Sequence, residues 1–162
     1  MKIDETTRDS LRVSALYRGR VREDLELFRP THVVSLLDPA LAPEKIPNFG
    51  AIPAMQRQFY DLDTPGVHVL SSQMLGEIVE FVSGWAAARQ RGEEARLLVH
   101  CHMGASRSTA TALIALAVLH GPGNEARAFA DLLTITNKPW PNYNIVAMAD
   151  DLLTRQGLLM AE

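Results

Sequence analysis

The stretch from Leu97 to Ala110 restricts the fold of this chain more than any other, because it joins two apolar runs through a polar loop with the only cysteine. The first run, 97–99, is short and bounded, which predicts a buried strand. The second run, 109–119, contains mainly Ala, Leu, Ile and Val, and Gly121 follows it as a helix stop signal. A chain that passes from a buried strand through a loop into a helix indicates an α/β fold.

The loop between these runs has the composition of an anion-binding site. It contains no acidic residue and leads into Arg107. A loop at a helix N-terminus presents unpaired backbone N–H groups and the positive end of the helix dipole, and both attract an anion. The planar guanidinium group of an arginine can bind two oxygens of a phosphate at once. We therefore expect a phosphate to be bound by Arg107 and by the N–H groups of His102, Met103, Gly104, Ala105 and Ser106.

The same surroundings are expected to activate the cysteine. A helix N-terminus and a nearby arginine stabilise a thiolate, so Cys101 is expected to attack the bound phosphorus as a nucleophile. Ser108 can donate its hydroxyl to the sulfur and stabilise the thiolate when it leaves in a second, hydrolytic step. His100 can orient the loop through hydrogen bonds to its carbonyl groups. The alternative is a cysteine that only packs in the core as a small hydrophobic residue.

The string His100-Cys101-x-x-Gly104-x-Ser106-Arg107-Ser108 resembles the signature of the cysteine-dependent protein tyrosine phosphatases, in the form typical of their dual-specificity-like branch. The resemblance implies a phosphocysteine intermediate and a phosphatase loop between a central strand and a buried helix. Two departures limit it. The chain lacks the aromatic-bearing loop that deepens the pocket of the tyrosine-specific enzymes. It also lacks the basic residues that lipid-phosphate and inositol-phosphate relatives often carry inside the Cys loop.

A thiolate mechanism on a phosphate ester also needs an acid to protonate the leaving oxygen. Asp61 and Asp63 follow a predicted strand, in a loop that Pro65 and Gly66 shape. Related phosphatases carry their general acid in a similar place, so the resemblance implies that Asp61 is the acid and Asp63 the reserve. Asp38, at the end of another predicted strand, is the third candidate. The alternative for each is an aspartate that only stabilises a turn or caps a helix.

The rest of the chain predicts further strands and helices. Strands are expected over 11–16, 31–37 and 56–60, and helices over 21–28, from Ser72 to Gly92, after Asn124 as the cap, and over 144–156. A strand, a long helix and a second strand imply a right-handed crossover and a parallel pair, with the Cys loop at the carboxyl edge. We therefore predict one phosphatase-like α/β domain over 1–162, with a central, largely parallel sheet of four to five strands flanked by helices.

Composition excludes several classes of protein. A net charge of −3 argues against a general binder of nucleic acid or anionic membranes. The longest apolar stretch, 110–119, is too short to cross a bilayer. One cysteine cannot form an internal disulfide, and the first residues lack the apolar core of a signal peptide, so a cytoplasmic protein is expected. The isolated His32, His68 and His120 do not form a ligand set, and we expect no metal and no cofactor.

Three functions fit this pattern. The first is hydrolysis of a phosphomonoester, either a small molecule or a protein that carries phosphotyrosine, with phosphoserine and phosphothreonine as further substrates. The second is a binding module that uses the same loop to hold a phosphorylated partner without turnover, which the presence of Cys101, Arg107 and Ser108 disfavours. The third is a rhodanese-like sulfurtransferase, which needs no aspartate acid and is disfavoured by the pair Asp61 and Asp63.

Overall fold

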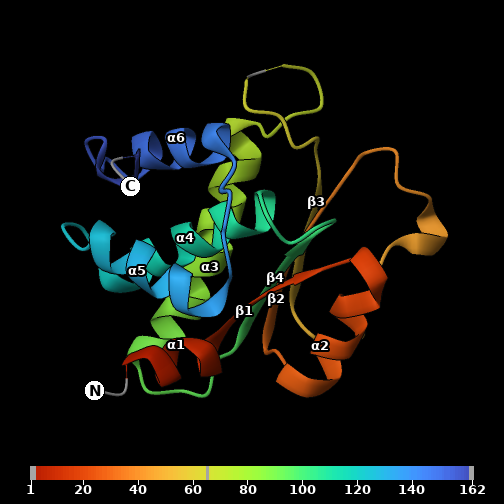
Figure 1. Cartoon of the computed structure of the whole chain (residues 1–162), viewed down its shortest axis with the longest axis horizontal. Coiled ribbons are helices and arrows are strands. Elements are labelled where there is room, and N and C mark those ends of the chain that lie inside the picture. The colour runs from red at the N-terminus through yellow and green to blue at the C-terminus, as the bar shows by residue number, and fades with distance from the viewer. Residues whose placement is uncertain (1–2, 65, 161–162) are drawn as a thin grey trace.

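Four short strands form a parallel sheet at the centre of the computed structural model, which describes residues 3–64 and 66–160 (Figure 1). They are β1 (Leu11–Ala15), β2 (His32–Leu37), β3 (Ala54–Gln58) and β4 (Leu97–Cys101), in the spatial order β1-β4-β2-β3. All three neighbouring pairs are parallel. This confirms the predicted fold class, with four strands. Pro65 lies outside the described residues, so its expected part in the loop after β3 is untested.

The two central strands, β2 and β4, are buried almost throughout. Their sequences are nearly continuous apolar runs, because parallel strands are covered on both faces of the sheet. On β4, Leu98 packs on one side of the sheet with Val33 and Phe28, whereas Leu97 and Val99 join the larger core on the other side. The sheet therefore has two cores, one under each layer of helices.

The helices cover the two faces unequally, as Figure 1 shows: α2 lies on one side of the sheet, and α3 to α6 lie on the other. The bounds are α1 Ile3–Ser10, α2 Arg20–Phe28, α3 Ser72–Gln90, α4 Arg107–His120, α5 Glu125–Ile135 and α6 Tyr143–Leu152, with short 3₁₀ turns at Tyr17–Gly19, Pro43–Lys45 and Leu158–Met160. Helix α4 is buried from Arg107 to Ala117, because it packs against the sheet and three neighbouring helices. Its N-terminus meets the carboxyl end of β4, as the sequence predicts.

Several boundaries differ from the prediction. Helix α1 was not predicted, and β3 runs over Ala54–Gln58 instead of 56–60. After Phe59 donates to Leu37, the chain leaves β2, and the N–H of Tyr60 donates to His68 instead. Strands β3 and β4 are parallel, as predicted, and β2 lies between them in the sheet.

Two helix ends also differ. Helix α6 ends at Leu152, before the predicted 156, because the Asp150 carboxylate accepts hydrogen bonds from the N–H groups of Gly157 and Leu159 and turns the chain back. Asn124 lies at the predicted cap position of α5. Its side chain makes no capping bond there and donates to the His120 carbonyl.

Candidate active site

The Cys loop, residues 102–106, connects β4 to α4 at the carboxyl edge of the sheet. Two backbone hydrogen bonds of 3.0 Å each, from Leu16 N–H to Cys101 and from Tyr17 N–H to His102, attach it to the chain that leaves β1. Gly104 has a φ of +73°, and a Cβ there would lie 2.9 Å from the Ser14 carbonyl oxygen. Only glycine permits both this backbone conformation and this close approach.

Cys101 is 2% exposed and lies at the base of this loop. Its Sγ is 3.2 Å from the Oγ of Ser108, in the first turn of α4. The structure thus places the sulfur beside the N-terminus of α4 and within hydrogen-bond distance of a hydroxyl. A hydroxyl at this distance can donate to the sulfur, which is the contact that the sequence analysis expects of Ser108.

Arg107 is 4% exposed and fixed by two acceptors. Its Nη1 donates to Asp38 Oδ1 at 2.8 Å and to the Phe59 carbonyl at 2.7 Å. Its Nε is buried and has no hydrogen-bond partner within the described part of the chain. A buried donor without a partner is costly, and an oxyanion in the loop could satisfy it. Asp38, considered from the sequence as a third general acid, here holds the arginine.

Asp61 lies against the Cys loop. Its Oδ1 accepts hydrogen bonds from Ser106 Oγ at 2.8 Å and from Asn142 Nδ2 at 2.7 Å. Asp63 instead accepts a hydrogen bond of 3.3 Å from the N–H of Tyr143, at the start of α6. Of the two aspartates, Asp61 is the one in direct contact with a loop residue.

Asn142 is a site residue that the sequence analysis missed. It is 2% exposed, and its Nδ2 also donates to the Leu62 carbonyl at 3.0 Å, while its Oδ1 caps α6 by accepting from Ile145 N–H. Its own N–H donates to Ser106 at 3.1 Å. One side chain thus joins the Asp61 loop, the Cys loop and α6. An Asn before an apolar run signals a helix cap, but no sequence pattern shows which loop the cap also contacts.

His100 supports the loop from inside the sheet. Its Nδ1 donates to the Cys101 carbonyl at 3.2 Å, so its Nε2 accepts from Ser35 Oγ at 2.7 Å. Gln56 Nε2 in turn donates to Ser35 Oγ at 3.1 Å. Burial lowers the pKa of His100 to about 4, which keeps its ring neutral at pH 7. The predicted role of His100 in orienting the loop agrees with the bond to Cys101.

His102 faces Asp38 and is half-buried. Its Nε2 accepts a 2.9 Å hydrogen bond from the Asp38 N–H. Burial lowers the pKa of His102, and the charge of Arg107 acts in the same direction, against the opposing effect of the Asp38 carboxylate. The same Nε2 lies 3.8 Å from Asp38 Oδ2. Because that nitrogen accepts a hydrogen bond, the ring is neutral and the contact is no ion pair.

The remaining residues of the Cys loop differ in exposure. Met103 and Ala105 are exposed, and Gly104 and Ser106 are half-buried. Within the described residues, no backbone hydrogen bond uses the N–H groups of Met103, Gly104, Ala105 and Ser106. These four N–H groups are free of backbone partners in the described part of the chain, and the binding of an anion by them stays a prediction. Within 3–64 and 66–160, no group of three or more His, Cys, Asp and Glu side chains is placed to bind a metal ion.

Solved structures of several known proteins have a fold similar to that of this chain. No family model and no curated protein matches the sequence. Among solved structures, human DUSP28 is similar with a TM-score of 0.65 and 17% identity, covering 96% of this chain and 98% of its own. The human tyrosine phosphatase-like serine/threonine/tyrosine-interacting protein is similar with a TM-score of 0.64 and 19% identity, covering 96% of both chains. PTPMT1 in complex with PI(5)P has a TM-score of 0.61 and 13% identity, covering 95% of both chains.

The chain therefore has the fold of the compact, dual-specificity-like branch of the cysteine-dependent protein tyrosine phosphatases. In the part of the chain that the structure describes, no helix is both long and apolar enough to cross a membrane.

Proposed function

We propose that this chain, which has the fold of the compact dual-specificity phosphatases, hydrolyses phosphomonoesters through a phosphocysteine intermediate. The observation that carries the proposal is the burial and hydrogen bonding of the Arg107 guanidinium group. This group is buried, fixed through Nη1, and retains a buried Nε without a partner in the described part of the chain. Such a donor, next to the Cys101 sulfur and a loop of open N–H groups, suits the oxygens of a phosphate.

In the first step, the Cys101 thiolate attacks phosphorus, and an S–P bond forms as the bond to the leaving oxygen breaks. Asp61 donates its proton to that oxygen, so an alcohol or phenol departs. Ser106 and Asn142 hold the Asp61 carboxyl group at the loop. Asp63 is the reserve for this role.

In the second step, water attacks the phosphocysteine, and the Asp61 carboxylate takes the proton of that water. The S–P bond breaks, inorganic phosphate leaves, and the Ser108 hydroxyl stabilises the thiolate through the contact of 3.2 Å. The reaction needs no cofactor. The nucleophile must stay reduced, which agrees with a cytoplasmic location.

We place phosphorylated proteins first among the substrates, with phosphotyrosine preferred and phosphoserine and phosphothreonine accepted. A neutral His102 and the absence of Lys and Arg from residues 102–106 favour a single phosphoryl group over a polyphosphorylated ring. The second candidate is a binding module without turnover. The similar human protein described as tyrosine phosphatase-like and as an interacting protein supports that candidate.

The test is hydrolysis of a chromogenic aryl phosphate at mildly acidic pH without added metal. We expect turnover by the parent chain, none by Cys101→Ser, and retained binding of a phosphate analogue by that variant, because Arg107 and the loop N–H groups remain. Ser108→Ala should slow the second step and let the phosphocysteine accumulate, visible as an 80 Da adduct by mass spectrometry. Turnover of Cys101→Ser within tenfold of the parent would contradict the mechanism.

A further inference from the structure

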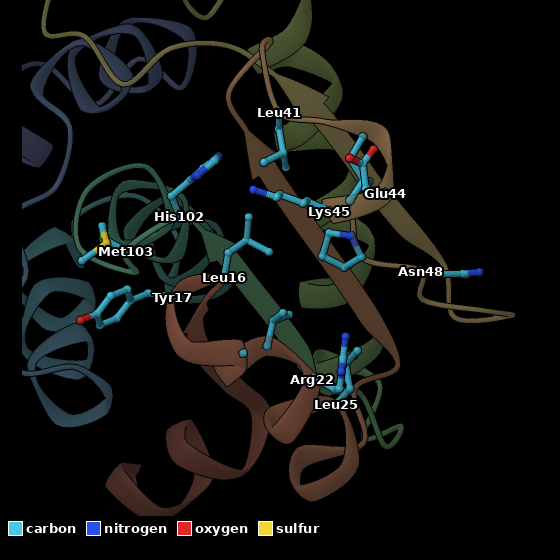
Figure 2. A pocket seen from close by; sticks show the side chains of 14 residues that line it. Leu16, Tyr17, Arg22, Leu25, Leu41, Glu44, Lys45, Asn48, His102 and Met103 are labelled. Carbon is cyan, nitrogen blue, oxygen red and sulfur yellow. The ribbon is translucent and has the colours of Figure 1, made fainter.

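A cavity of about 810 Å³ lies directly beside the Cys loop (Figure 2). One wall comes from the residues between β1 and α2 and from α2 itself, and the facing wall comes from the segment 41–48 after β2. Its size is within the range of sites that bind ligands. Its apolar surface is formed by Leu16, Val21, Leu25, Leu41, Ile46 and Pro47.

The cavity borders the Cys loop of the candidate active site. His102 and Met103 of the Cys loop line it, directly after Cys101. Tyr17 lies on the same border, and Figure 2 shows it next to Met103. Met103 is 61% exposed and Tyr17 is 49% exposed, so two large, accessible side chains lie where the loop borders the cavity. A group held on the Cys loop can extend across them into the cavity.

The charges at the cavity are mainly positive. Arg22 and Lys45 line it together with a single acid, Glu44. Neither cation forms an ion pair within residues 3–64 and 66–160. In Figure 2 the amino group of Lys45 points across the cavity toward His102. The cavity therefore combines an apolar interior with two cations that an acidic group could neutralise.

We propose that this cavity binds a large apolar side chain close to the phosphorylated residue of a peptide substrate, with an acidic residue of the same peptide on Arg22 and Lys45. The inference rests on the proposed phosphatase function and names the substrate features that the site selects. Residues 102–106 contain no Lys or Arg of their own, and the cavity beside them has a mainly aliphatic wall, which favours an apolar side chain over a polyphosphorylated ring. An apolar side chain gains free energy by leaving water for the aliphatic surface.

The first experiment compares two phosphotyrosine peptides that differ only in having Leu or Ser beside the phosphorylated residue, together with a small aryl phosphate. We expect kcat/KM to be about tenfold higher for the Leu peptide. For each variant we divide kcat/KM for the Leu peptide by kcat/KM for the aryl phosphate. Leu41→Gln should reduce this ratio about tenfold, because Leu41 is half-buried on the cavity wall. Leu27→Gln is the matched control, since Leu27 is an exposed residue of α2 that does not line the cavity. It should keep the ratio.

The second experiment tests the charges. Lys45→Glu should reduce kcat/KM for a peptide with a nearby Glu several-fold relative to the same peptide with Gln, and added salt should diminish the difference. Arg127→Glu, at an exposed position of α5, is the control and should not change this ratio.

The outcomes separate the two proposals. If the parent hydrolyses the aryl phosphate but treats Leu and Ser peptides alike, the cavity inference is wrong and the phosphatase function stands. If no substrate is hydrolysed, the phosphatase function is wrong, and fluorescence anisotropy with the same peptides tests the cavity by itself: tighter binding of the Leu peptide supports it, and equal binding overturns it. Faster hydrolysis of a phosphoinositide, lost in Leu41→Gln, would overturn the assignment to a peptide.

Discussion

Arg107 is oriented by contacts within the protein. Asp38 and the Phe59 carbonyl both accept from Nη1, which holds the guanidinium group in place while Nε has no partner among the described residues. A donor that is already in place costs no reorganisation when charge develops in the transition state. Asp38 thus acts as a positioning residue, a role that its place at a strand end did not reveal.

Removal of the Asp38 carboxylate should therefore weaken catalysis without removing the nucleophile. We expect Asp38→Ala to lower kcat/KM for an aryl phosphate about 10- to 100-fold, the worth of a hydrogen bond between charged groups. Binding of a phosphate analogue should weaken in parallel. Arg107→Lys should cost more, because an ammonium group cannot replace the two-pronged guanidinium. Equal activity of Asp38→Ala and the parent would show that Phe59 alone orients the arginine.

Phosphate esters with different leaving groups can distinguish the roles of Asp61 and Asp63. Asp61→Asn should lower kcat by about 10² to 10⁴ on a phosphate ester with a poor leaving group, and much less on a phenol that departs without a proton. The amide oxygen can still accept from Ser106 and Asn142, so the loop should stay in place.

Asp63→Asn is the matched control, because its partner is the Tyr143 N–H. We expect little change in kcat across a series of aryl phosphates. If Asp63→Asn gives the steeper dependence on leaving-group pKa and Asp61→Asn does not, Asp63 is the acid.

The local pattern around Cys101 predicted the candidate residues on either side of the Cys loop: Cys101 at the end of β4, and Arg107 and Ser108 at the start of α4. It could not predict Asn142 or the role of Asp38, because their contacts join segments that are far apart in the sequence. A short motif carries information about its own loop and the adjoining helix turn, but tertiary packing decides what lies opposite that loop.

At the scale of elements, the Cys loop depends on its contact with the end of β1. Gly104→Ala should displace the loop, because the new Cβ would meet the Ser14 carbonyl at 2.9 Å. We expect more than a tenfold loss of kcat/KM on an aryl phosphate and a lower Tm. Gly92→Ala is the control: Gly92 has a φ of +79° but nothing within 4 Å of an added Cβ. It should lower Tm through backbone strain of about 1 kcal/mol and keep its activity.

The hydrogen bonds from Gln56 through Ser35 to His100 connect β3, β2 and β4 beneath the Cys loop. Because burial lowers the pKa of His100 to about 4 from an unfolded value of 6.5, the unfolded chain binds a proton at a higher pH than the folded chain. The contribution of His100 to stability is therefore complete above about pH 6.5 and is lost as the pH falls toward 4. Its size is about 3 kcal/mol.

Urea unfolding between pH 4 and pH 8 checks this expectation. The free energy of unfolding of the parent should fall with decreasing pH more steeply than that of His100→Gln, which cannot take up the proton. The difference between the two curves isolates His100 from the other titrating groups. Parallel curves would mean that His100 has the same proton affinity in both states.

Periodicity predicted the elements that bury a clear apolar stripe or run, such as α3 and β4. It missed α1, whose segment Ile3–Ser10 carries mostly polar residues. Periodicity also predicted the start and the end of β3 two residues too far along the chain. The residue pattern around Gln56 and Phe59 does not show where the chain separates from β2. That point is set by the partner of Tyr60, which is His68.

At the scale of the whole molecule, the chain has one cysteine, and it is buried at the base of the loop. Two folded chains cannot bring their sulfurs to the bonding distance of about 2.05 Å, and no second thiol exists within one chain. We expect peroxide to inactivate the protein through a sulfenic acid or a sulfenamide, or through a mixed disulfide with a small thiol. Dithiothreitol should restore activity.

Mass spectrometry without reductant checks this expectation, and it should show modified monomers and no linked dimers. Parent protein that keeps full activity and unchanged Cys101 labelling after peroxide treatment would show that the thiol is not activated.

The strand order also determines when the parts of the candidate site come together during folding. Leu11 of β1 pairs with Leu97 of β4, so the sheet closes only after most of the chain has been brought together. Topologies with such distant pairings fold slowly, because loop entropy is lost before the contacts compensate for it. Asp38, Asp61, Cys101 and Asn142 come from four separate segments that meet in the finished fold. A partly folded chain therefore carries the local segment from Cys101 to Arg107 without Asp38, Asp61 and Asn142 against it, and the proposed chemistry requires the completed fold.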